Sequence, residues 1–169
     1  MPLPRMRLDP VGSGSIRAIL PASVIAVAPS RDTGRAMSQE NLEIVRALFD
    51  AWERGGLDAV AEFWDPQIDW RAVEGAIDDA GPISGVDAMR AYLQEGLDLF
   101  DEVSLEPEEL IDAGDQVVAV QRVSGRGKAS GIETELRYAV VYTVRGGKIV
   151  RGREYWERDE ALEAVGLRE

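Results

Sequence analysis

The chain has 169 residues, with 31 acidic and 19 basic side chains, and it contains neither cysteine nor histidine. This length suits one domain with one core. Without cysteine there are no disulfides, thiol nucleophiles or thiolate metal sites, and without histidine there is no Ser-His-Asp arrangement and no imidazole metal ligand. Any chemistry must therefore depend on carboxylates, Tyr, Arg, Lys, Ser or Thr.

The first 36 residues differ from the rest in charge. They hold five Arg and two Asp, whereas residues 37–169 hold 29 acidic and 14 basic side chains. A body this acidic repels phosphate backbones, and no run of about 18 apolar residues is present, so we expect neither nucleic acid nor a membrane as partner. A cytoplasmic location is the expectation that follows.

We expect residues 1–36 to be a disordered or spurious extension, because Met37 opens a helix that has Ser38 as its N-cap. Residues 18–28 also imitate a secretory signal with a small-residue cleavage site, and that alternative stays open. The body, residues 37–169, is predicted to be one domain.

Helices dominate the first half of this body. Residues 38–54 carry Leu42, Val45, Phe49 and Trp52 at spacings of three and four, which predicts an amphipathic helix. Gly55-Gly56 ends it. The next elements are a short helix at 57–64, a strand at 68–73, a loop at 74–85 and a third helix at 86–100.

Strands fill the second half. Residues 103–111, 116–126, 133–145 and 148–156 are predicted strands, joined by a turn at 112–115, a loop at 127–132 and the Gly146-Gly147 hairpin turn. A closing helix follows at 159–165. Helices first and an antiparallel sheet afterwards indicate an α+β domain with helices packed on one face of the sheet.

Five segments carry a family resemblance: MSQENLEIVR at 37–46, DPQIDW at 65–70, ELIDAGD at 109–115, GKIVR at 147–151 and EALEAVG at 160–166. They closely resemble the SnoaL-like branch of the nuclear transport factor 2-like superfamily, over residues 37–169. The resemblance implies an α+β cone, in which a curved antiparallel sheet packs against N-terminal helices around a pocket, also described as a cystatin-like roll.

The resemblance does not name a reaction. The branch includes polyketide cyclases, and the wider superfamily includes ketosteroid isomerase, limonene epoxide hydrolase, dehydratases and members without known activity, so fold alone does not give chemistry. The cyclases carry a catalytic acid on the last strand, and Glu154 occupies that place. They also use a histidine, which this chain lacks.

Glu154 is the first catalytic candidate from its neighbours as well. Alternation along the strand places it on one face with Val150, Gly152 and Trp156. On a concave face, a carboxylate among such neighbours is suited to move a proton. The alternative is an exposed carboxylate that pairs with a neighbouring arginine, Arg151 or Arg153, or with an adjacent strand.

Arg122 and Tyr138 complete the catalytic candidates. Arg122 lies within an apolar alternation, where it needs a partner or a ligand, and it could stabilise an enolate oxygen. Its alternative is a structural ion pair with Glu154 or Glu135. Tyr138 shares its face with Tyr142, and a tyrosine hydroxyl could donate to a developing oxyanion or simply pack in the core.

The strand at 133–145 is apolar on both faces. One face would line the pocket, and the other must then exclude water by another route, for which we expect a second subunit. This pattern predicts a homodimer through the outer face of the sheet.

The substrate-binding candidates are mainly aromatic side chains large enough to line a pocket. Glu74 joins them as the runner-up base, because it lies in the loop after Trp70. The alternative is that the rings are core. The set comprises Trp52, Trp64, Trp70, Glu74, Tyr92, Tyr142 and Trp156.

Three functions fit these features. The first is a small enzyme of the isomerase, cyclase, dehydratase or epoxide hydrolase type that needs no cofactor or metal and acts on an apolar carbonyl or epoxide compound. The second is a module that binds a small hydrophobic ligand unchanged. The third is a dimerisation scaffold with a filled core.

Overall fold

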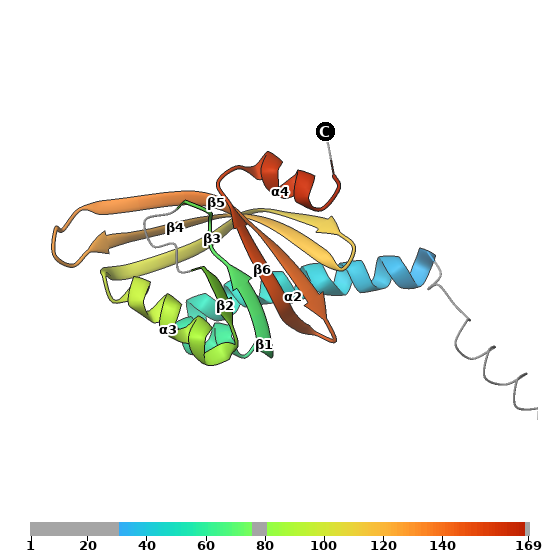
Figure 1. The fold of residues 1–169 in the computed structure, drawn as a ribbon, viewed down its shortest axis with the longest axis horizontal. Helices are drawn as coiled ribbons and strands as arrows, with labels where there is room; N and C mark the ends of the chain where they lie inside the picture. The colour runs from blue at the N-terminus through green and yellow to red at the C-terminus, as the bar shows by residue number, and fades with distance from the viewer. Residues whose placement is uncertain (1–30, 76–80, 168–169) are drawn as a thin grey trace, which may run out of the picture. The chain divides into compact units, whose positions relative to one another are not determined.

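The structure is a computed structural model, and it describes residues 31–75 and 81–167. The expectations for residues 1–30, the signal-like stretch included, fall outside these ranges. Residues 34–169 form one compact unit. The elements (Figure 1) are α2 Arg31–Ala61, β1 Trp64–Arg71, β2 Pro82–Ser84, α3 Val86–Leu97, β3 Phe100–Ala113, β4 Gln116–Gly127, β5 Glu133–Arg145, β6 Lys148–Tyr155 and α4 Arg158–Ala164.

Six strands form one curved sheet in the order β2-β1-β6-β5-β4-β3. All neighbours are antiparallel except β1 and β6, which run parallel. In Figure 1, α2 and α3 lie on one side of this sheet and α4 lies on the other. The predicted α+β cone fold is confirmed.

The first helix is longer than its sequence pattern predicted. It begins at Arg31, so Ser38 lies inside the helix and is not its N-cap. The predicted break is present, because Gly56 has the non-helical angles φ 59° and ψ −143°. Such a positive φ suits glycine, which lacks a Cβ atom.

Pairing between distant segments extends the sheet beyond the local pattern. β1 begins at Trp64, four residues before the predicted strand, and Trp64 pairs with Ile149 of β6. The predicted loop contains the short strand β2, in which Ile83 pairs with Trp70. Both additions depend on partners far along the chain, which a local pattern does not reveal.

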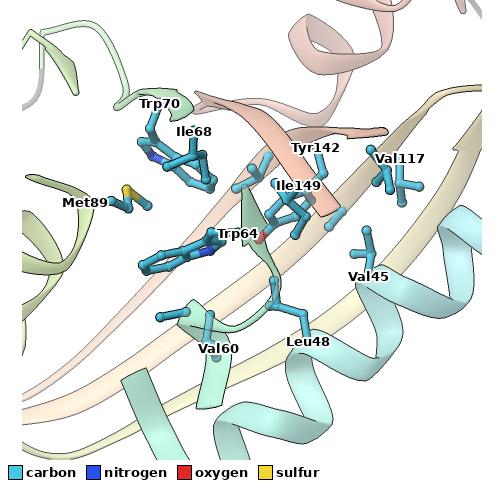
Figure 2. Close-up of a cluster of buried hydrophobic side chains, with 14 of the residues drawn as sticks. Val45, Leu48, Val60, Trp64, Ile68, Trp70, Met89, Val117, Tyr142 and Ile149 are labelled. Carbon is cyan, nitrogen blue, oxygen red and sulfur yellow. The ribbon is translucent and has the colours of Figure 1, made fainter. Parts of the chain in front are cut away.

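The main core lies between α2 and the inner face of the sheet. Figure 2 shows Val45 and Leu48 of α2 pointing toward the strands, with Ile149 and Val117 opposite them. Val45 and Ile149 are fully buried. Burial of aliphatic side chains of this size contributes about 1.5–3 kcal/mol each, so this layer fixes the helix on the sheet.

A second, smaller core covers part of the outer face. Val118, Ala139 and Val141 pack there against Ala161 and Leu162 of α4. The chain therefore covers with its own last helix the apolar residues that suggested a second subunit. The apolar outer face therefore no longer argues for a second subunit, and the homodimer stays a prediction.

Two sets of contacts hold α4 in place. Arg158 donates from Nε and Nη2 to the carboxylate of Glu109 on β3, at 2.8 and 3.0 Å. Glu157 and Glu160 form a capping box at the start of the helix.

No helix within residues 31–75 and 81–167 is both long and apolar enough to cross a membrane.

Candidate functional site

A cavity of about 340 Å³ lies on the inner side of the sheet, where α2 and α3 supply part of its wall. Most of its lining is aliphatic or aromatic. Six of the seven residues predicted to bind substrate line it, and Figure 2 shows three of them, Trp64, Trp70 and Tyr142. The six are Trp52, Trp64, Trp70, Tyr92, Tyr142 and Trp156.

Glu154 also lines the cavity and is half-buried there. Its Oε1 accepts a hydrogen bond from Trp70 Nε1 at 3.0 Å, and its Oε2 accepts one from the backbone N–H of Val73 at 3.3 Å. Arg151 and Arg153 point to the other face, where both pair with Asp69, at 3.6 and 2.9 Å. Two N–H donors thus hold the carboxylate at the wall of an apolar space.

Gly152 positions Trp70 for this contact. The two residues pair across β1 and β6. A Cβ atom on Gly152 would lie 2.0 Å from Cζ3 of the indole, so the ring rests directly on the backbone of Gly152. Tyr142 holds the indole from another side in an edge contact, with 5.8 Å between ring centroids. The sequence placed Gly152 beside Glu154, but only the strand pairing shows what its missing side chain permits.

A chain of hydrogen bonds joins two of the predicted tyrosines through Gln121. Tyr142 donates from its hydroxyl to Gln121 Oε1 at 3.1 Å, and Gln121 Nε2 donates to the hydroxyl oxygen of Tyr138 at 2.9 Å. Gln121 is only 3% exposed, and all three side chains line the cavity.

Sequence reasoning did not select Gln121. The signal that could have found it is a single polar residue on the strand face that also carries Val117, Ala119 and Val123. A buried amide on such a face needs partners for its donors and its acceptor.

The tyrosine hydroxyls are held in their protonated form. Burial raises the pKa of Tyr138 well above its usual range, and the charge of Glu154 and the neighbouring Tyr142 raise it further. Burial and the charge of Glu154 also raise the pKa of Tyr142. Both groups therefore act as hydrogen-bond donors at ordinary pH.

The structure places Arg122 outside the cavity, on the outer face of β4. Its guanidinium donates to Glu106 at 2.7 Å and lies 3.9 Å from Glu135. Of the two alternative ion pairs, the one with Glu154 is therefore not formed, and the one with Glu135 is present as a longer contact. β4 presents Gln121 to the cavity, so its neighbour Arg122 faces the opposite way.

Glu74 also lies outside the cavity wall. It is exposed, in the turn that follows β1. The preceding residue, Val73, turns its backbone N–H toward Glu154. Glu74 is thus a neighbour of the site in the chain, without lining it.

The fold agrees with comparisons to known proteins. The model of the SnoaL-like domain family matches residues 45–152. The chain belongs to this family, within the nuclear transport factor 2-like superfamily.

Individual proteins are similar to this chain in sequence or in fold. An uncharacterised protein of Mycobacterium bovis is 32% identical over 127 residues, which cover 73% of this chain and 94% of the relative. A nuclear transport factor 2-like protein of unknown function from Burkholderia pseudomallei has a TM-score of 0.61 at 21% identity, over 75% of this chain and 98% of its own.

A protein from Jannaschia species CCS1, proposed to be a SnoaL-like polyketide cyclase, has a TM-score of 0.62 at 18% identity. The match covers 85% of this chain and 100% of that protein. At this level of identity, the two structural neighbours show that the fold is shared.

Proposed function

We propose that the protein is a small enzyme that moves a proton on an apolar carbonyl or epoxide compound bound in the cavity. One observation carries the proposal: the Glu154 carboxylate lines an apolar cavity and is held there by Trp70 Nε1 and the backbone N–H of Val73. An oriented carboxylate in an enclosed site is a suitable general base.

Tyr138 supplies the second group. Its hydroxyl stays protonated, because burial raises its pKa, and it can donate to the oxygen on which negative charge develops when a proton leaves the adjacent carbon. Eight aromatic side chains of the described residues line the cavity, and they surround the apolar part of the substrate. These steps need only side chains of this chain. The neighbour proposed to be a polyketide cyclase is consistent with carbonyl chemistry.

Deuterium exchange tests the proposal without knowledge of the product. A panel of apolar ketones, 2-acetylnaphthalene included, is incubated with the protein in D₂O, and NMR follows deuterium uptake at the carbon beside the carbonyl. We expect the wild type to accelerate uptake and Glu154→Gln to lose about 100-fold or more of that rate, the usual contribution of a general base.

Glu74→Gln is the matched control, because it removes a carboxylate that is close in the chain but exposed. It should leave the exchange rate unchanged. Equal exchange rates in the wild type and Glu154→Gln would refute the role of Glu154.

A binding module is the second candidate, and the composition of the cavity favours it. Among the described residues that line the cavity, Glu154 is accompanied by tyrosines but by no Asp, Lys or Arg. A ligand held without change needs no second charged group. Ketones that bind tightly and show no exchange in the wild type would support this function over the enzymatic one.

A further inference from the structure

The hydrogen-bond chain through Gln121 has a direction. The amide of Gln121 accepts from Tyr142 through Oε1 and donates to Tyr138 through Nε2. An amide oxygen can only accept and an amide nitrogen can only donate. The bond from Gln121 therefore occupies the oxygen of the Tyr138 hydroxyl, and the hydrogen of that hydroxyl must point elsewhere.

No described residue accepts this hydrogen. Within residues 31–75 and 81–167, the one hydrogen bond of the Tyr138 hydroxyl is the bond it receives from Gln121. Tyr138 lines the cavity, so its O–H group can donate to a molecule bound there. The Tyr138 side chain is partly buried, and a ligand oxygen would supply the acceptor that the described residues do not.

We infer that Gln121 is a positioning residue that fixes the Tyr138 hydroxyl as a donor, and that the cavity thereby selects apolar ligands with a carbonyl oxygen. The inference rests on the proposed function for the cavity itself, but not on proton transfer by Glu154. Gln121 is 3% exposed, so water has little access to replace its hydrogen bonds to Tyr142 and Tyr138. This burial strengthens the preference for ligands with a carbonyl oxygen.

Strand pairing explains why Gln121 can hold both rings. It lies directly opposite Tyr138 in the β4–β5 pair. Tyr142 follows Tyr138 by four residues and shares its face. The amide thus lies within reach of both hydroxyls, and Tyr142 fixes which end of the amide meets Tyr138.

Two probes of nearly the same shape test the inference on the full chain. 2-Acetylnaphthalene has a carbonyl oxygen, whereas 2-isopropenylnaphthalene has a CH₂ group in that place. Calorimetry gives both dissociation constants. Infrared difference spectra, with the carbonyl carbon labelled as ¹³C, report whether that oxygen accepts a hydrogen bond.

The wild type should bind the ketone roughly three- to tenfold more tightly than the hydrocarbon, which corresponds to one hydrogen bond. Its carbonyl band should lie below the frequency found in hexane. Tyr138→Phe should abolish the preference and return the band to the hexane value. Gln121→Met should reduce the preference and shift the band toward that value.

Affinity for the hydrocarbon serves as the test of folding, since all correctly folded variants should keep it within about twofold. Thr134→Val removes another hydroxyl from the cavity wall, on the β5 face that carries Tyr138, and should change neither the preference nor the band. A wild-type band at the hexane value, or a band that Gln121→Met leaves unmoved, would overturn the inference. Loss of exchange in Glu154→Gln with an intact band would separate the two proposals.

Discussion

The two faces of strands β4 and β5 differ in the burial and bonding of their polar side chains. On the inner face, Gln121 is buried and bonded to one tyrosine at each end of its amide. On the outer face, the next residue, Arg122, has a side chain that is 38% exposed and lies within 4.0 Å of Glu106, Glu108 and Glu135.

This difference shows where specificity can arise. Inner-face bonds are buried or partly buried, so water replaces them poorly and leaving one unmade is costly. Outer-face ion pairs are screened by solvent and contribute little to stability. The pKa directions follow the same division: the guanidinium of Arg122 lowers the pKa of Glu106, whereas burial raises that of Tyr138.

Gly152→Ala should disturb the inner face most. The added methyl group would lie 2.0 Å from the Trp70 ring, and Trp70 is only 5% exposed and braced by Tyr142. The ring must move away from Glu154. We expect a loss of about 3 kcal/mol in the free energy of unfolding, at the upper end for overpacking, measured by urea denaturation, and weaker binding of 2-acetylnaphthalene.

Gly96→Ala provides the control. Gly96 also lines the cavity, but it lies in α3, and a Cβ atom there would meet nothing within 4 Å. Alanine in a helix should leave the stability unchanged or raise it by about 0.5–1 kcal/mol. Equal stability of the two variants would show that Trp70 is not held against Gly152.

High pH should reveal the buried tyrosines. Tyrosine in the unfolded chain titrates near pH 10, whereas burial raises the pKa of Tyr142 in the folded protein. The unfolded state therefore loses its proton first, and stability falls as pH rises above about 10, by up to about 1.4 kcal/mol per pH unit for each such tyrosine. Below about pH 9, this contribution is fully present.

Tyr142→Phe checks this assignment, because it removes one of the two hydroxyls. Urea unfolding at about pH 9 and about pH 11 should show a smaller loss of stability in the variant than in the wild type. At about pH 9 the variant should be less stable by about 1–2 kcal/mol, since Gln121 Oε1 loses its donor. Identical losses between the two pH values would contradict the role of this hydroxyl.

Much of the fold was predictable because its signals are local. The predicted strand at 133–145 and the Gly146-Gly147 turn match β5 and the hairpin that follows it. Gly56 breaks the first helix where the sequence placed the break. The parallel pairing of β1 with β6 was not predictable in this way, because no local pattern records which distant strand lies alongside.

The candidate site was predicted unevenly for a related reason. Alternation separates the residues of β4 into two faces but does not say which face is inside. β4 is apolar on both faces, since α4 covers Val118 on the outer one. We therefore selected Arg122 from the sequence, whereas Gln121 is the neighbouring residue that lines the cavity. On β6 the contrast between Glu154 and its arginine neighbours was clearer, and Glu154 lies on the cavity side.

The smallest effect should come from Arg122→Met, which pairs with Gln121→Met as a test of the two faces. The substitution removes the contact of the guanidinium with Glu106, an exposed pair that salt already screens. We expect ketone affinity to change by less than about twofold and the infrared band to stay in place. The stability difference from the wild type should shrink further at high salt.

Gln121→Met, one residue earlier, should cost about 1–3 kcal/mol because it leaves the Tyr142 donor without its acceptor. If Arg122→Met proved the more damaging substitution, or shifted the carbonyl band, the proposed difference between inner-face and outer-face contacts would be wrong.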